Sequence, residues 1–307
     1  MLIFILKRFL QIIPVAIGVT LAVFLMLHMI PGDPARIMAG EAANEAQLEQ
    51  MRYNLGLTDP LWLQYIRYIT NAVQGDLGTS IRTNRSVTAE IFDQRFGITV
   101  QLATLGTALA VLFGLTAGII SAVYKRGILD ILFMFIALLG LSMPNFWLGI
   151  LLINHFSVRL NILPVAGWGT YAHMVLPSVT LGVTGMAIIA RMTKTSLVEI
   201  LNQDYIRTAH AKGTADRIII YKHALRNALV PVITVVGLQF GTLLGGAVIT
   251  ESVFAINGMG RLIVDSIRAQ DFPVVQGAVL VVALVFVFVN TVVDITYRFA
   301  NKRIDLS

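Results

Sequence analysis

The chain has 307 residues, of which 56% are hydrophobic and 13% are charged, with a formal net charge of +6. A soluble domain carries roughly 25% charged residues, so this composition excludes an ordinary soluble protein and predicts an all-α chain that crosses a membrane several times. There are no cysteines, which excludes disulfide bonds and thiolate metal sites.

A basic N-terminus with Lys7 and Arg8 precedes the first apolar run, residues 9–30. A transmembrane helix needs about 20 apolar residues, so residues 1–30 are predicted to form the first span. No small-residue cleavage site follows this run, which favours a retained span over a signal peptide. The sequence PGDP (residues 31–34) ends the run abruptly.

Residues 31–97 form the large polar region and are predicted to be a partly helical extracytoplasmic loop. A helix is expected over residues 41–55. A second is expected to start at Asp59 and Pro60, with the aspartate as N-cap and the proline at the first helical position. That second helix is amphipathic and is expected at the membrane interface or against the membrane body, with one apolar face. This face comprises Trp62, Tyr65, Ile66, Ile69 and Val73.

Five further apolar runs predict five more spans, which gives six in all and no convincing internal repeat. A membrane core of five helices is therefore expected over residues 98–293, followed by a tail over residues 294–307. Pro144 falls near the middle of the third run and predicts a kinked or discontinuous helix, while Pro177 is expected in the first turn of the fourth. The runs are residues 98–123, 131–157, 174–190, 229–250 and 274–293.

Basic residues set the predicted orientation, because loops on the cytoplasmic side of a membrane carry an excess of lysine and arginine. With the N-terminus inside, every lysine of the chain falls on the inner side, and both termini are predicted to be cytoplasmic. The positive charge is thereby assigned to membrane orientation, and no nucleic-acid partner is expected. The lysines are Lys7, Lys125, Lys194, Lys212, Lys222 and Lys302.

Patterns that carry catalysis are missing from the sequence. There is no GxxxxGK[ST] phosphate loop, no HExxH and no GxSxG, and the histidines have no metal-ligand spacing. No catalytic residue and no metal site are predicted, although an intramembrane enzyme stays open as an alternative.

The predicted spans hold few ionisable residues, which argues against an ion-coupled transporter and implies that the energy for transport comes from elsewhere. The polar side chains in or near the spans have two interpretations: hydrogen bonds between helices, or the lining of an aqueous substrate path. The candidates for the path are Asn145, Gln239, Glu251 and Asn290.

The cytoplasmic segment 197–228 contains the longest polar, basic passage between two spans, residues 204–226. It predicts two short helices broken at Gly213, with small residues that would let another protein approach closely. From these residues alone, it is either a surface gripped by a partner or an ordinary helical hairpin whose charges fix the topology.

The sequence YIRTAHAKG (residues 205–213) resembles the YIRTARAKG form of the EAA motif, the coupling loop of ABC importer permeases. The family pattern is EAAxxxG, followed after nine residues by IxLP. This chain lacks the glutamate and the final proline of that pattern, as is usual in the peptide-importer branch, where a later proline, here Pro231, is common. The resemblance implies a docking surface for a separate ATPase. Its residues are Asp204, Tyr205, Arg207, Thr208, Ala209, Ala211, Lys212, Gly213, His223, Leu225 and Arg226.

The resemblance covers nearly the whole chain. The chain is similar to the first permease subunit of dipeptide and oligopeptide importers, a branch that includes glutathione and nickel permeases. Asn257 departs from it, because the family often has proline before GxG. The order and spacing of the motifs carry the similarity. They are HMIPGDP (28–34), LGLTDPL (55–61), GDLGTS (75–80), SMPNFW (142–147), LPS (176–178), GLQFG (237–241), ESVF (251–254), GMG (258–260) and DFPVVQ (271–276).

The resemblance implies a type I ABC importer transmembrane fold and a non-catalytic translocation subunit of a bacterial inner membrane. The implied partners are a homologous second permease, two ATP-binding subunits that hold ATP and Mg²⁺, an extracytoplasmic binding protein and the lipid bilayer; no cofactor is implied for this chain. Di- and oligopeptides lead as substrates, with glutathione, a nickel chelate or another small solute as alternatives. A self-contained channel or secondary transporter is the more distant alternative.

Three glycines at a spacing of four, Gly237, Gly241 and Gly245, would allow close helix packing on the fifth span. In the family that the chain resembles, two permeases meet along such spans, so packing between permeases is expected there. The outer loop, residues 31–97, is expected to support docking of the binding protein.

Overall fold

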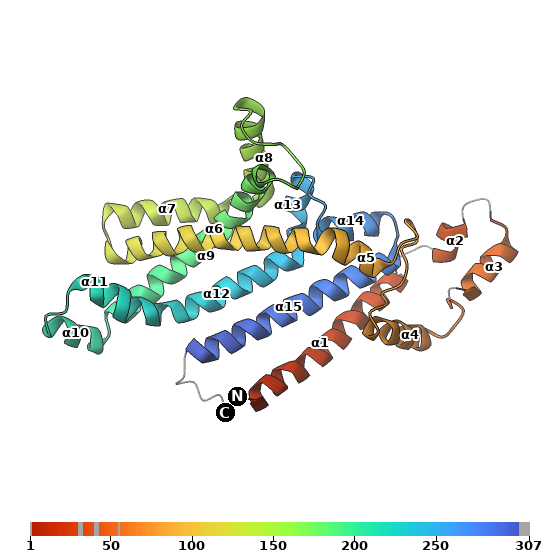
Figure 1. Ribbon diagram of the computed structural model, residues 1–307, viewed down its shortest axis with the longest axis horizontal. Coiled ribbons are helices and arrows are strands. Elements are labelled where there is room, and N and C mark those ends of the chain that lie inside the picture. Colours follow the sequence, from red (N-terminus) through yellow and green to blue (C-terminus); the bar gives the residue numbers. More distant parts are fainter. Residues whose placement is uncertain (1, 30–32, 40–42, 55, 301–307) are drawn as a thin grey trace. The chain divides into compact units, whose positions relative to one another are not determined.

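The computed structural model describes residues 2–29, 33–39, 43–54 and 56–300, and their secondary structure is helical apart from one isolated bridge, Thr79–Ser86 (Figure 1). The chain forms two compact units, Met1–Thr99 with Asn257–Val285, and Val100–Ile256 with Phe286–Ser307. Residues 257–285 belong to the same unit as the N-terminal part, and the expected chain boundaries stay predictions. The PG pair at residues 31–32 and residues 301–307, with Lys302, lie outside the described residues.

The first unit contains the N-terminal helix, the outer segment and the start of the last long helix. Its apolar core joins residues of the outer segment to α14 and α15, among them Val87, Met259 and Ala278. Its elements are α1 (Leu2–Met29), α2 (Pro34–Ala39), α3 (Glu45–Asn54), α4 (Leu61–Val73), α5 (Val87–Ile91), η1 (Phe92–Phe96), α14 (Met259–Arg268) and the first half of α15 (Phe272–Ala300).

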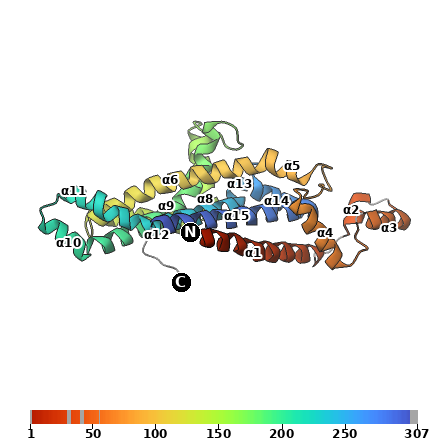
Figure 2. The same cartoon turned by 60° about the horizontal axis from the view of Figure 1, so that its bottom comes forward.

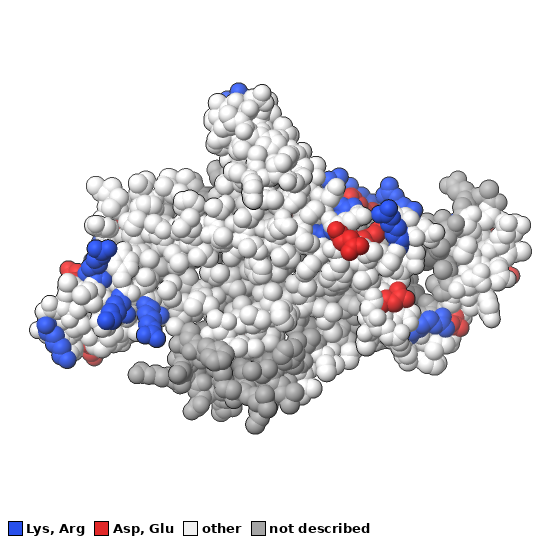
Figure 3. All heavy atoms as spheres, in the orientation of Figure 1, with Lys and Arg blue, Asp and Glu red and all other residues white. Residues whose placement is uncertain are grey.

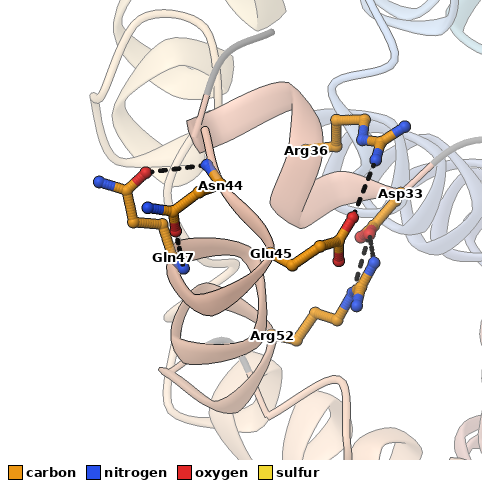
Figure 4. Close-up of polar contacts among 6 residues, drawn as sticks. All are labelled: Asp33, Arg36, Asn44, Glu45, Gln47 and Arg52. Atoms are coloured by element: carbon orange, nitrogen blue, oxygen red, sulfur yellow. Dashed lines mark hydrogen bonds and ion pairs between the residues drawn. The ribbon is translucent and has the colours of Figure 1, made fainter. Parts of the chain in front are cut away.

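Helix α3 begins later than the residue 41 expected from periodicity, because Asn44 caps it. The amide of Gln47 donates to the side-chain oxygen of Asn44 at 2.9 Å, and the amide of Asn44 donates to Oε1 of Gln47 at 3.0 Å. This reciprocal arrangement is a capping box. Arg52, near the end of the same helix, pairs with Asp33 at 2.6 Å and so ties α3 to the start of α2 (Figure 4).

The start of α4 differs from the prediction by one residue. Pro60 lies at the N-cap position and helix geometry begins at Leu61. The carboxylate of Asp59 pairs with Arg67 at 2.7 Å, and no side-chain capping bond is made at this helix start. The expected roles of Asp59 as N-cap and Pro60 as the first helical residue are therefore wrong: Pro60 has a non-helical ψ of 143°, and the Asp59 carboxylate pairs with Arg67, two turns into the helix.

A buried aspartate fastens the hairpin that carries the Thr79–Ser86 bridge to the start of α15. The Asp271 carboxylate accepts hydrogen bonds from the Ser80 hydroxyl at 2.5 Å, the Ile81 amide at 3.1 Å and the Arg82 amide at 3.4 Å. Asp271 is buried, so these donors replace the water that the charge would otherwise need.

The second unit holds long helices joined by short segments. Helix α9 packs against both α7 and α12, and the long helices α6, α9 and α12 of this unit are labelled in both views (Figure 1, Figure 2). Its elements are the rest of α6 (Gly97–Val123), α7 (Ile128–Ser142), α8 (Asn145–Leu152), η2 (Ile153–Arg159), α9 (Tyr171–Leu201), α10 (Asp204–Ala211), α11 (Asp216–Ile218), η3 (Ile219–Ala224), α12 (Leu225–Gly246), α13 (Val248–Val253) and the second half of α15.

Glycines on α6 allow its close packing against α9. A Cβ atom on Gly114 would lie 2.9 Å from Ile189, and one on Gly118 would lie 2.6 Å from Thr193, both closer than side chains tolerate. These two glycines are four residues apart, the small-residue spacing typical of tightly packed membrane helices. This spacing is visible in the sequence alone.

The third predicted span is discontinuous, and the break is sharper than a kink. Helix α7 ends at Ser142, and the helical pair Ile128–Ser142 and Asn145–Arg159 bends by 103°. Met143 adopts an extended conformation with ψ of 126°, because the proline ring that follows it disfavours helical geometry. The expectation of a kinked or discontinuous helix at Pro144 is confirmed, and residues 131–157 do not form one straight crossing.

Within the described residues, four helices are long and apolar enough to cross a membrane, and the bent pair brings the number to five. The first predicted span corresponds to α1, whose apolar part Ile13–Leu25 is shorter than the other four. Helix α9 begins at Tyr171, so Pro177 lies in its second turn and not, as expected, in the first. Here Thr170 starts the helix before the apolar run.

Candidate functional site

The polar segment that follows α9 is broken at Gly213, as predicted, but only α10 is a separate short helix, because α11 and η3 continue into α12 as one long helix over Asp216–Gly245. Helix α10 ends in a Schellman arrangement: the Gly213 amide donates to the carbonyl of His210 at 2.9 Å, and the Thr214 amide donates to that of Ala209 at 3.2 Å. Gly213 has φ of 74°, a left-handed conformation that glycine adopts without steric cost. The glycine therefore sets the angle between α10 and α11.

One apolar side chain anchors α10 to the helix ends around it. Ile206 is buried with 1% of its surface exposed, in a cluster that also holds Ala122, Leu197, Ile219 and Ala224. These residues come from α6, α9 and η3. Ile206 falls between the residues that the resemblance selected, and its burial shows that the segment rests on the membrane helices through this side chain.

Polar contacts complete the attachment. The Tyr205 hydroxyl accepts a hydrogen bond from the side-chain amide of Asn227 at 2.9 Å, which links α10 to the first turn of α12. Across the Gly213 turn, the His210 ring lies 3.4 Å from the Asp216 carboxylate. On α10 itself, Arg207 lies 3.5 Å from Asp204, an exposed pair that contributes little stability.

The opposite side of this segment is exposed and basic. Figure 3 shows lysine and arginine side chains gathered over the end of the second unit that carries α10 and α11. A shallow groove follows on α11 and η3, lined by Arg217, Ile218, Tyr221 and Lys222. We call the exposed face of residues 204–226 the coupling surface. Its exposed predicted members are Asp204, Tyr205, Arg207, Thr208, Ala211, Lys212, Gly213, His223 and Arg226.

Two predicted members of the surface are less accessible. Ala209 is half-buried against the Ile206 cluster, and Leu225 is half-buried at the start of α12. The π-helical turn η3 precedes Leu225 and contains His223. A π-helical turn adds one residue to the helical ladder and reorients the side chains around it, so the spacing in the sequence alone could not assign His223 and Leu225 to their sides.

The four polar residues expected to line a substrate path have different neighbours within the second unit. Asn145 accepts a hydrogen bond from the Thr184 hydroxyl at 2.8 Å. Gln239 lies beside α9, where a Cβ on Gly185 would be 3.4 Å from its Cγ. Glu251 is fully buried in α13.

Asn290 lies on another side of α12. Its Oδ1 is buried without a hydrogen-bond partner among the described residues, and it would lie 3.5 Å from a Cβ on Gly241. Residues 239 and 241 point about 200° apart on a helix, so Gln239 and Asn290 occupy opposite sides of α12. The chain does not bring the four together, and a shared path along them stays a proposal.

Of the glycines that were expected to pack between two permeases, two pack against another helix of this chain. A Cβ on Gly237 would be 2.0 Å from Cγ2 of Val293, and one on Gly241 would be 3.3 Å from the ring of Phe286, so both face α15. Contact within the chain accounts for these two glycines. Gly245 is exposed, and packing against a second permease stays a prediction for it.

An ion pair at the N-terminal end of α7 was missed by sequence reasoning. The Lys194 ammonium on α9 lies 2.5 Å from the Asp130 carboxylate, which also accepts from the amide of Arg126 at 3.0 Å. Asp130 is buried. The partners are 64 residues apart in the chain, and neither residue belongs to a motif, so the sequence contains no signal for the pair.

The family comparison identifies the chain over most of its length. Residues 114–306 match the family described as binding-protein-dependent transport system inner membrane component. Residues 1–103 match the N-terminal part of such transport-system membrane components. The second match includes the outer segment.

The chain is also similar to curated transport proteins and to solved transporter structures. The glutathione transport system permease proteins GsiC of Pectobacterium atrosepticum and Escherichia coli K12 are each 47% identical over 304 residues, which covers 99% of both chains. Among solved structures, an inward-facing MetNI methionine ABC transporter chain matches 67% of this chain and 94% of its own, with a TM-score of 0.56 and 20% identity. An amino acid ABC transporter chain matches 77% and 98%, with a TM-score of 0.51 and 13% identity.

Proposed function

Because the chain belongs to the family of binding-protein-dependent transport system inner membrane components, the permeases of ABC importers, we propose that it is the translocation subunit of a bacterial importer for short peptides. Permeases of this family work with a partner permease, ATPase subunits and a substrate-binding protein. In the proposed complex, two ATP-binding subunits hold ATP and Mg²⁺, and this chain performs no catalysis.

The observation that carries the proposal is the coupling surface. Helix α10 exposes a short basic face and buries Ile206 among the ends of α6, α9 and η3. A partner that grips the exposed face therefore pushes directly on the ends of long helices. Packed helices respond to such a push as rigid bodies, so closure of an ATPase dimer would rock the spans and alternately open the path.

The proposed orientation places the coupling surface on the cytoplasmic side, where the ATP is. The lysine pattern supports it, because Lys194, Lys212 and Lys222 lie in or next to this surface. Both termini then lie in the cytoplasm of an inner membrane, and residues 31–97 face the binding protein.

The proposed substrates are peptides of two to a few residues. The GsiC relatives are named for glutathione transport, and glutathione is itself a tripeptide, so it is the first substrate to test. Di- and oligopeptides follow, then nickel chelates. The polar side chains of this chain do not separate these substrates, because specificity in such a system rests with the binding protein.

The test is purification of the chain from its native membrane, reconstitution of the complex in liposomes, and measurement of ATP hydrolysis and uptake of labelled glutathione and dipeptides. We expect a second permease and two ATP-binding subunits to copurify, with hydrolysis stimulated by the peptide and its binding protein. A chain that purified alone and took up solute in response to an ion gradient would instead be a channel or secondary transporter. Copurification of the complex without peptide uptake would refute the substrate class and leave the importer assignment intact.

A further inference from the structure

Helix α4 has three distinct sides, and the coupling surface involves none of them. Successive residues of a helix are about 100° apart. The first side packs on the protein, a second is polar, and the third is an exposed apolar stripe. We define the α4 stripe as Trp62, Ile66, Ile69 and Val73, which lie within about 60° of one another.

The protein-facing side is held by specific contacts within the first unit. The Tyr65 hydroxyl hydrogen-bonds with that of Thr20 at 2.9 Å and donates to the carbonyl of Ile17 at 3.2 Å, and its ring lies edge-on to Phe24. Tyr68 packs against the core shared with α15, and this burial raises the pKa of its phenol to about 12. The orientation of α4 about its own axis is therefore fixed.

These contacts place α4 at membrane depth. Thr20 is nine residues before the end of α1, which corresponds to about 14 Å along a helix. The apolar core of a bilayer is about 30 Å thick. With α1 crossing the membrane, the Tyr65 hydroxyl lies near the middle of the bilayer, and the body of α4 lies in the outer half.

Among the described residues, most of the stripe is uncovered. Trp62 is 64% exposed, Ile66 52% and Val73 84%, Ile69 is half-buried, and the stripe holds no charge. On α1, next to the Tyr65 contacts, Ile17, Leu21 and Leu25 are also exposed at a spacing of four, so the apolar surface continues from α1 onto α4. The nearest charge on α4, Arg67, lies on the polar side and is paired with Asp59 at 2.7 Å.

We propose that α4 is embedded in the outer leaflet of the membrane, with the α4 stripe in contact with lipid acyl chains and its polar side turned to the extracytoplasmic water. This arrangement satisfies all three sides at once: protein takes Tyr65 and Tyr68, acyl chains take the stripe, and water takes the side of Arg67 and Asn71. Amphipathic helices with tryptophan in the apolar face bind membranes in this way. The proposal does not depend on the substrate or on the ATPase partners.

The chain offers a direct test because it contains no cysteine. Ile66→Cys and Val73→Cys on the stripe, and Asn71→Cys on the polar side as the matched control, are each labelled with a nitroxide in the full-length chain. The chain is reconstituted in vesicles of phosphatidylethanolamine and phosphatidylglycerol. Collisions of the label with oxygen, which concentrates in lipid, and with a water-soluble nickel chelate are then measured by electron paramagnetic resonance.

We expect the ratio of oxygen to nickel collisions to be several-fold higher at Ile66 and Val73 than at Asn71. A label on the stripe that meets the nickel chelate as often as the Asn71 label would place the stripe in water and overturn the proposal. Shielding of the stripe labels from both reagents, in the chain alone or after assembly with its partner permease, would show that protein covers the stripe and would also overturn it. Val73 is already 84% exposed, so that variant tests the proposal even where Ile66→Cys disturbs the helix.

Discussion

Two short segments that connect long helices are attached to them in opposite ways. In the first unit, the 79–86 hairpin is held by directional hydrogen bonds to the buried carboxylate of Asp271. In the second, α10 is held mainly by the apolar side chain of Ile206 in a small cluster. Hydrogen bonds weaken steeply with misalignment, whereas apolar contact is non-directional. We therefore expect the hairpin to be fixed and α10 to tilt with a partner while its anchor stays buried.

The largest effect should come from removing the polar attachment. Asp271→Ala leaves the donors of Ser80 and Ile81 without their acceptor, at a cost of about 3 kcal/mol or more in the attachment of the hairpin. The exposed Arg82 and Arg85 should then be cut faster by trypsin, which is measured by limited proteolysis from the side on which we propose that the hairpin lies, the extracytoplasmic side. Asp265→Ala is the control, since this aspartate is exposed and its 3.4 Å pair with Arg261 is an exposed i,i+4 contact within α14. Equal cleavage rates in Asp271→Ala and the unaltered chain would show that the hydrogen bonds to Asp271 do not hold the hairpin.

Removing the apolar attachment should have the next largest effect. Ile206→Ala empties part of the small cluster under α10 and weakens its docking by about 2–3 kcal/mol. In the reconstituted complex, peptide uptake should fall while ATP hydrolysis persists, because the ATPase still turns over without moving the spans.

The matched control for this change is Ile128→Ala, the same substitution at a side chain that is 84% exposed. It should leave uptake unchanged. If Ile206→Ala transports peptide at the normal rate per ATP hydrolysed, the anchor has no part in coupling.

Substitutions of Gly213, in the turn after α10, should have effects of graded size. Gly213 has φ of 74° and open space around the position of a Cβ, so the cost of a substitution is conformational and not steric. Gly213→Ala should cost about 1 kcal/mol, Gly213→Asn less, because asparagine tolerates this region, and Gly213→Val most. Uptake should follow the same order without loss of membrane insertion.

Gly169 supplies the control, because it has φ of 131° and equally open surroundings but lies between η2 and α9, outside both the coupling surface and residues 31–97. Gly169→Val should leave ATP-coupled uptake close to normal. Normal uptake by Gly213→Val would contradict the role of the turn in coupling.

The smallest effect is expected for the hydrogen bond between α10 and α12. Tyr205→Phe removes the acceptor for Asn227 from a half-exposed site, a loss of about 0.5–1 kcal/mol. Uptake should fall slightly, and Asn227→Ala should have the same effect alone and no additional effect in the double variant. An additive loss in the double variant would show that the two residues act separately.

Local sequence was enough to predict several features of the fold and of the candidate site. The break at Gly213, the discontinuity at Pro144 and the long helices follow from glycine and proline geometry and from runs of apolar residues. The coupling surface was found by its resemblance to a motif. The length of α9 and the starts of α3 and α4 were misjudged, because capping and ion-pairing residues outside the apolar run decide where a helix begins.

The sequence by itself determined that this chain crosses a membrane and which family it resembles, and it indicated the segment that we propose as the surface for a partner. Only the tertiary structure decided that Ile206 anchors that segment, that Gly237 and Gly241 face α15, and that Asp271 reaches Ser80 across 191 positions. The physical reason is the range of the interactions. Backbone geometry and hydropathy act over a few neighbouring residues, whereas a buried carboxylate or a close-packed glycine acquires its role from whichever distant helix folding brings to it.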